Sequence, residues 1–190
     1  MHISKVTKGL IAGGLGLALL IGGGTFALWS DSQTVDAGTL NSGQLDVTVN
    51  GTSTWANIND PANPVPIDDI TTYHIVPGDI LQLNTSLTVT AIGDDLHADL
   101  SVDLSGLSSG DTDLLAIVKA NSELSVASGG GHTPQKDPVA DNTFDIDATT
   151  DSALAATLTI TFPQDTADQV AQGESVDLGA LKFTLDQVAS

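Results

Sequence analysis

Apolar and polar residues alternate along most of the chain after residue 43. A period of two is typical of strands that bury one face. The alternation predicts strands at residues 44–50, 80–90, 96–104, 124–127, 143–147, 153–162 and 180–185. Short strands at this spacing predict an all-β fold, a jelly-roll-like antiparallel β-sandwich.

The connections between these strands carry turn and loop residues. Gly93-Asp94-Asp95 predicts a hairpin turn between the strands at 80–90 and 96–104. Residues 57–71 and 128–142, which are rich in Pro, Asn, Asp and Gly, predict surface loops.

Helical signals are limited to two segments, so we expect at most one or two short helices. Residues 165–172 predict a two-turn helix, with Asp165 capping its start and Gly173 its end. Residues 113–120 fit either a helix or a strand.

The first 27 residues have the three parts of a secretory signal peptide in order. A basic start is followed by an uncharged apolar stretch at residues 10–21, and glycines then break the apolar helix. The small residues Thr25 and Ala27 predict cleavage between Ala27 and Leu28. Residues 10–29 are also long enough for an uncleaved membrane anchor, which stays open as the alternative. After cleavage we expect a secreted protein with no stable membrane anchor.

The charge is confined to the part after the predicted cleavage site. All 24 acidic residues lie there, and only Lys119, Lys136 and Lys182 oppose them, which leaves a net charge of −21. Binding to nucleic acid is excluded because almost nothing could neutralise phosphates. Such a charge favours cations as partners. The chain has no cysteine, so its stability depends on the apolar core and the sheets.

No catalytic motif and no cofactor-binding motif stands in the sequence. The three histidines of the predicted mature chain, His74, His97 and His132, lack the spacing of metal ligands. His97 lies on the polar face of its predicted strand, which indicates a solvated side chain. We therefore predict that the protein is not an enzyme and has no catalytic, cofactor-binding or metal residue.

Aspartates close in sequence are the one candidate for cation binding. They could offer oxygen ligands to Ca²⁺, although none matches the pattern of an EF-hand. A solvated acidic surface is the simpler interpretation. The pairs are Asp68-Asp69, Asp94-Asp95, Asp111 with Asp113, and Asp145 with Asp147.

Two segments near the N-terminus resemble the TasA/camelysin family, whose members are exported through a SipW-type signal peptide. The first is Gly22 to Asp31, with its glycine run, Thr25-Phe26-Ala27 and Leu28-Trp29-Ser30-Asp31. The second is Ala37 to Val47, which opens the first strand. Further along, Val76-Pro77-Gly78-Asp79 resembles a turn of this family that opens a long strand.

A closer similarity is to actinobacterial exported proteins with the same alternate signal. The similarity rests on four segments: Trp29-Ser30-Asp31, residues 76–79, Val89 to Leu100, and Ile160-Thr161-Phe162. The resemblance implies a SipW-type signal peptidase as a partner. It also implies a jelly-roll subunit of extracellular or cell-surface fibres, such as those of a biofilm matrix. Camelysin-like members have been classed as metallopeptidases, so a secreted metallopeptidase is one alternative, and a Ca²⁺-binding surface module is another.

These observations divide the chain into a signal peptide at 1–27, an N-terminal arm or first strand at 28–43, and one β-sandwich domain at 44–190. The arm carries Leu28, Trp29, Val35 and Leu40. We expect it to add as a strand to an exposed sheet edge of the next subunit, and such a head-to-tail contact can generate a filament. Two alternatives stay open. The arm could fold back as the first strand of its own sandwich, or Trp29 could serve only in recognition by the peptidase.

Overall fold

The computed structural model describes residues 39–188, apart from residues 111, 131, 148 and 168. The predicted cleavage site and most of the arm lie outside the described residues. Asn41–Ser190 form one compact unit, which has a hydrophobic core of its own.

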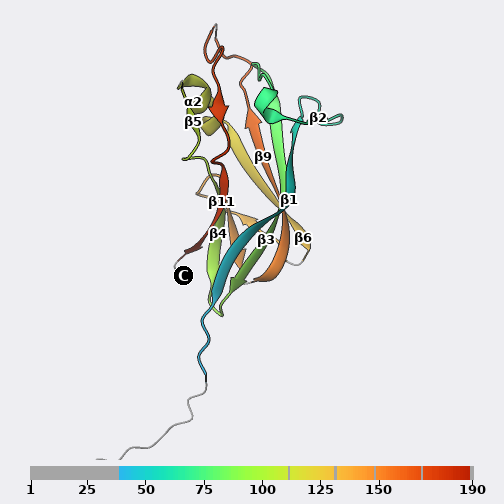
Figure 1. Ribbon diagram of the computed structural model, residues 1–190. Coiled ribbons are helices and arrows are strands. Elements are labelled where there is room, and N and C mark those ends of the chain that lie inside the picture. The colour runs from blue at the N-terminus through green and yellow to red at the C-terminus, as the bar shows by residue number, and fades with distance from the viewer. Residues whose placement is uncertain (1–38, 111, 131, 148, 168, 189–190) are drawn as a thin grey trace, which may run out of the picture. The chain divides into compact units, whose positions relative to one another are not determined.

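Two antiparallel sheets face each other in this unit (Figure 1). The larger sheet has the order β2-β1-β3-β9-β6, with bounds β1 Gln44–Asn57, β2 Val65–Ile67, β3 Ile80–Ile92, β6 Ser122–Gly130 and β9 Thr149–Thr161. The smaller sheet has the order β11-β4-β8-β7, with bounds β4 His97–Asp103, β7 Gln135–Lys136, β8 Thr143–Asp147 and β11 Lys182–Val188.

Short elements gather at one end of the sandwich. They are the 3₁₀ turn η1 Ile70–Thr72, the helix α2 Asp113–Ala120, and the paired strands β5 Ser108–Ser109 and β10 Val176–Asp177. In α2, Leu114 and Val118 are four residues apart and therefore share the buried face of the helix.

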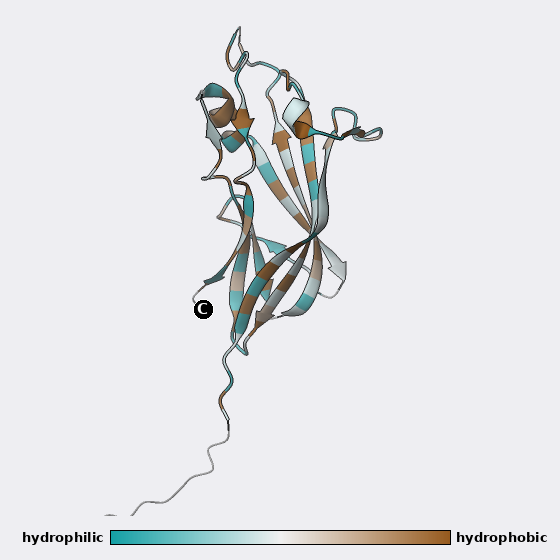
Figure 2. Ribbon diagram, viewed as in Figure 1, coloured by the Kyte–Doolittle hydropathy of each residue, from teal (hydrophilic) through white to brown (hydrophobic). Residues whose placement is uncertain are grey.

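The core lies between the two sheets. Hydropathy alternates along the strands, as the brown and teal bands of Figure 2 show. Leu87 of β3, Leu100 of β4 and Leu158 of β9 have no exposed surface. Complete burial of one such side chain stabilises the fold by about 1.5–3 kcal/mol. The predicted all-β antiparallel sandwich is confirmed.

The predicted hairpin at Gly93-Asp94-Asp95 is wrong. The turn forms, but β3 and β4 belong to different sheets and do not pair with each other. Their alternation fits a strand in either sheet, because both strands bury one face against the same core. The local sequence shows the turn but not which sheet receives the next strand.

The predicted helix at 165–172 is also wrong. Its described residues form separate turns, each closed by a backbone N–H that donates three residues back, as from Val170 to Ala167 and from Gln172 to Gln169. Ala171 is buried and has a φ of 61°, which a right-handed helix does not accommodate. The core contact of Ala171 overrides the weak helical preference of a short segment.

The two predicted loops are partly ordered as secondary structure. Residues 57–71 contain β2 and the start of η1, and residues 128–142 contain β7 and the end of β6. No helix among the described residues is both long and apolar enough to span a membrane.

Candidate functional site

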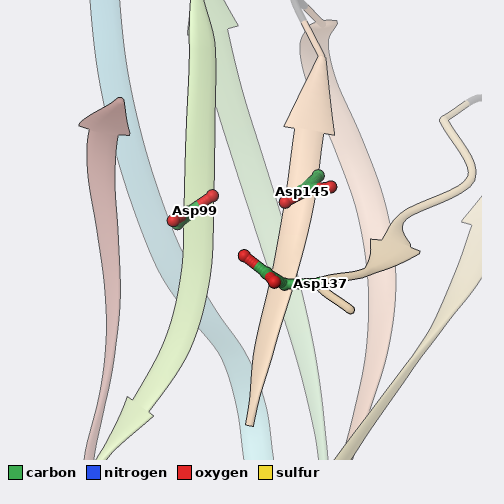
Figure 3. A group of neighbouring side chains, drawn as sticks. All are labelled: Asp99, Asp137 and Asp145. Atoms are coloured by element: carbon green, nitrogen blue, oxygen red, sulfur yellow. The ribbon is translucent and has the colours of Figure 1, made fainter. Parts of the chain in front are cut away.

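Three aspartates meet on the outward face of the smaller sheet (Figure 3). Asp99 of β4 lies directly opposite Asp145 of β8 in the ladder, and Asp137 directly follows β7. One carboxylate oxygen of each lies within 4.8 Å of the others. We call these three residues the acidic cluster.

Burial and like charges both act on the acidic cluster. Burial and the negative charges of Asp145 and Asp137 raise the pKa of Asp99 above its ordinary value. Asp186 of β11, which lies opposite Asp99 on the other side of β4, adds to this effect. The two lysine ion pairs in the described part of the chain lie elsewhere: they join Lys136 to Glu123 and Lys182 to Asp103.

Asp137 is held in its ionised form by its own loop. The backbone N–H groups of Ala140 and Val139 donate to its Oδ1 at 2.9 Å and 2.6 Å, and they lower the pKa of Asp137. A charged carboxylate is therefore fixed beside Asp99, whose ionisation is disfavoured.

Oxygen-only ligands of this kind suit Ca²⁺, whereas zinc sites in proteins are built mainly from histidine and cysteine. A bound cation would also relieve the repulsion among the three carboxylates. The arrangement can thus concentrate divalent cations on this face of the sheet.

The aspartate pairs singled out in the sequence take other positions, with Asp145 as the exception. Asp147 points outward beside His97, whose Nδ1 lies 3.3 Å from its carboxylate. Asp69 caps η1 by accepting from the N–H of Thr71. Asp94 lies in the turn between the sheets, and Asp111 lies outside the described residues.

Sequence reasoning missed Asp99 and Asp137. The available signal was that Asp99 and Asp145 each occupy the polar phase of an alternating strand. Nothing local shows that these two strands are neighbours, or that the segment after β7 brings Asp137 beside them.

The three histidines stay apart, and the described residues contain no group of three ligands that includes one. His97 is more than half exposed, as predicted for a solvated position. His132 has a buried Nε2 with no hydrogen-bond partner in the described structure. His74 lines an apolar cleft of about 450 Å³ at the end of the sandwich that carries α2. Glu174 also lines this cleft, and its carboxylate accepts from the N–H of Leu114 at 2.7 Å, near the start of α2.

A second aspartate site is built around the motif Val76-Pro77-Gly78-Asp79. Pro77 and Gly78 are the central residues of a turn closed by the Asp79 N–H to Val76 carbonyl bond at 3.0 Å. Gly78 has a φ of 97°, which the third position of such a turn requires and which glycine adopts without strain. The turn is tied to the residue that follows β9, because the N–H of Gly78 donates to the carbonyl of Phe162 at 2.8 Å.

The Asp79 side chain is almost fully buried and accepts four hydrogen bonds. Asn57 and Asn59 donate to Oδ1 at 3.2 Å and 3.0 Å. Tyr73 OH and the N–H of Val76 donate to Oδ2 at 3.1 Å and 3.0 Å. We call this set the Asp79 network.

Hydrogen bonding decides the protonation state of Asp79. Burial alone would raise its pKa, but the donors from Val76, Asn59, Tyr73 and Asn57 outweigh burial and hold the pKa below its ordinary value of 3.8. With its lone pairs occupied, this carboxylate is a structural element and not a free ligand.

The fold and the two sites define an all-β sandwich protein with an acidic sheet face and a structural Pro-Gly-Asp turn. The model of the camelysin metallo-endopeptidase family matches residues 2–187, and the chain belongs to this family. The family expected from the sequence is thereby confirmed. Searches among curated proteins and among solved structures each found no match.

Proposed function

We propose that the protein is a secreted structural subunit of an extracellular or cell-surface fibre, and that its N-terminal arm, residues 28–43, completes the sandwich of the next subunit. A SipW-type signal peptidase would release the arm by cleaving after Ala27. The observation that carries the proposal is a core that is incompletely covered along one side of the sandwich.

This side is formed by β1 and β11. Among the described residues, β1 has a ladder only with β3 from Gln44 to Thr54, because β2 pairs only with Trp55 to Asn57. In the same part of the chain, β11 has a ladder only with β4. The two strands approach each other, but no ladder joins them within the described residues. We call this side the β1–β11 edge.

Core-facing residues along the β1–β11 edge are only partly buried. Leu45 and Val47 of β1, and Phe183 and Leu185 of β11, pack against the core but keep exposed surface. Val49 is 50% exposed, although its ladder partner Leu87 has no exposed surface. An added strand would cover these side chains, at about 25 cal/mol for each Å² of apolar surface removed from water.

The opposite edge of the larger sheet is less open. Along β6, the side chain of Asn142 accepts from the N–H of Leu124 at 2.6 Å and donates to the carbonyl of Ser122 at 3.0 Å. These bonds occupy edge groups that a new strand would need. The β1–β11 edge is therefore the better acceptor.

The arm has the composition of a donated strand. Val35 and Ala37 alternate with polar residues, and Leu28 and Trp29 offer large apolar side chains. Backbone hydrogen bonds would supply affinity, and pockets for alternate side chains would supply specificity. An arm that pairs with another copy makes a contact that need not close on itself, which is how filaments form.

The test compares chains that begin at Leu28 and at Asn41. We expect both to fold by circular dichroism, and only the longer one to form filaments by electron microscopy. Val49→Lys in the longer chain should abolish filaments, because it places a charge on the incompletely covered core. Val65→Lys is the matched control, since Val65 is 62% exposed and lies on β2, away from this edge.

Two results would overturn the proposal. Filaments from both chains would show that the arm is not the donor. A folded longer chain that stays monomeric would show that the arm occupies the edge of its own sandwich or has no role in assembly.

The second candidate function is the peptidase activity that the family description names. The peptidase function would be preferred to the structural one if the purified protein binds zinc stoichiometrically, cleaves casein, and no longer cleaves it after chelation of the metal. The acidic cluster makes calcium binding a third outcome that metal analysis would detect in the same sample.

A further inference from the structure

The outward face of the larger sheet is free of charge at its centre. It consists of the outward side chains of β1 from Thr48 to Thr54 and their cross-strand partners on β3, β9 and β6, and we call it the neutral face. One row across the four strands reads Thr54, Asn84, Thr157 and Ser125, and Ser86 and Ala155 lie in the next row. The charged outward residues of these strands, Asp46, Asp151 and Glu123, lie at its margins, and Asp151 accepts a hydrogen bond from Thr90, the ladder partner of Asp46.

This absence of charge is unusual for the molecule. The chain carries 24 acidic residues. On the smaller sheet the corresponding outward row is Asp186, Asp99 and Asp145. Depletion of charged residues is one part of the compositional signal of an interface centre; the aromatic residues that mark strong interfaces are absent from the rows named here, which fits a weak contact. Two copies of so acidic a protein repel each other least where the facing surfaces carry no charge.

Several polar groups of the neutral face bond to their neighbours on the same face. Asn50 donates to Thr88 Oγ1 at 2.6 Å across β1 and β3. Thr157 donates to Asn84 Oδ1 at 3.1 Å across β9 and β3, and Asn84 donates to Gln82 at 3.3 Å. Polar groups that keep hydrogen bonds are much less costly to bury than unpaired ones.

The side chains are also small enough for two sheets to stack. Serine, threonine, alanine and asparagine leave a low surface, and stacked sheets lie about 10 Å apart. Three rows on four strands cover roughly 400 Å², from about 4.8 Å between strands and about 6.8 Å between successive outward residues. Two copies would then bury roughly 800 Å², which is less than a stable dimer needs.

We propose that the neutral face binds the same face of a second copy, as a weak lateral contact. The contact is isologous, which means that both copies use the same surface patch. A single pair binds weakly, but aligned subunits in two filaments would add their contacts. The inference does not require strand donation, because the face lies wholly within Asn41–Ser190.

The test uses a chain of residues 41–190, which contains the whole compact unit and lacks the arm. Static light scattering gives its osmotic second virial coefficient, a measure of weak self-association. We expect both Ser86→Asp and Ser86→Lys to make this coefficient more repulsive, because either charge would be desolvated at the contact. Ser86 is exposed and central on the middle strand of its sheet.

Ser101 is the control: it lies outward on β4 of the smaller sheet, is partly buried, and shares a hydrogen bond of 2.8 Å with the hydroxyl of Thr184. At this position only the change in net charge should affect the virial coefficient. Ser101→Asp should therefore increase the repulsion between copies, and Ser101→Lys should decrease it. The opposite signs expected for the two lysine variants distinguish a dry contact from general electrostatics.

The proposal is overturned if Ser86→Lys reduces repulsion as Ser101→Lys does. It is also overturned if the unmodified chain shows only the repulsion that its net charge produces. Circular dichroism melts confirm that each variant is folded. In filaments of the longer chain, Ser86→Lys should leave single filaments intact and remove their side-by-side bundles. Absence of all filaments would count against strand donation alone, while the light-scattering result would still decide this contact.

Discussion

Two aspartate sites in this protein show how differently one residue type can be used. In the Asp79 network, a nearly buried carboxylate receives four donors, and its pKa lies below the ordinary value. In the acidic cluster, Asp99 faces other carboxylates, and its pKa is raised. The first site contributes stability because its charge is satisfied. The second weakens the fold slightly and keeps its oxygens available to cations.

The largest effect we expect comes from Asp79→Ala. It removes the acceptor of four hydrogen bonds and leaves buried donors unpaired, which should lower the free energy of unfolding by roughly 3–5 kcal/mol. Urea denaturation measures the change. Asp60→Ala is the control, because Asp60 is exposed and accepts only within its own turn. Equal losses in both variants would contradict a special role for the Asp79 network.

The pH dependence of the Asp79 network follows from the sign of its shift. A carboxyl group with a lowered folded pKa stabilises the fold above the unfolded value of 3.8. This contribution is lost as the pH falls through the lower folded pKa. The difference in the free energy of unfolding between wild type and Asp79→Ala should therefore become smaller only below about pH 4.

Cations give the next effect. Calcium should raise the melting temperature more than sodium chloride at equal ionic strength, because a bound divalent ion relieves the repulsion in the acidic cluster. At tenfold excess over its dissociation constant, the gain is about 1.4 kcal/mol. The double variant Asp99→Asn and Asp145→Asn should lose this difference, and Asp46→Asn on the other sheet should keep it. Identical melting temperatures in both salts would show that the acidic cluster is a solvated surface that binds no calcium.

The smallest effect is that of Asp99→Asn without calcium. We expect it to raise stability at neutral pH by up to about 1 kcal/mol, because like charges directly opposite in a sheet are destabilising. Because the pKa of Asp99 is raised in the folded state, its ionisation opposes folding above that pKa. The stability gain of Asp99→Asn should therefore decrease as the pH falls through the folded pKa, and it should vanish below the unfolded value of 3.8.

Asp103→Asn is the contrasting variant on the same strand. Hydrogen bonds from Ser105 and the ion pair with Lys182 lower the pKa of Asp103 to about 2, so its neutralisation should lower stability. Changes of the same sign in Asp99→Asn and Asp103→Asn would contradict the contrast between a repelled and a paired carboxylate.

Prediction from sequence succeeded where a property is local. The long alternation at residues 80–90 became β3, and that at 96–104 became β4. Prediction failed where contacts with residues distant in sequence determine the local structure. The turn at Gly93-Asp94-Asp95 looked like a hairpin, but the chain crosses to the other sheet there. The helical signal at 165–172 yielded to the core contact of Ala171.

The same division applies to the sites. The sequence alone determined the apolar phase of the strands, the acidic character, the Pro-Gly-Asp turn and the family, because these depend on neighbouring residues or on composition. Only the tertiary structure decided that Asp99, Asp137 and Asp145 meet, and that one sheet face carries charge at its centre while the other carries it only at its margins. Strand order and register bring these residues together, and both are set by packing two sheets around one core, which no short segment encodes.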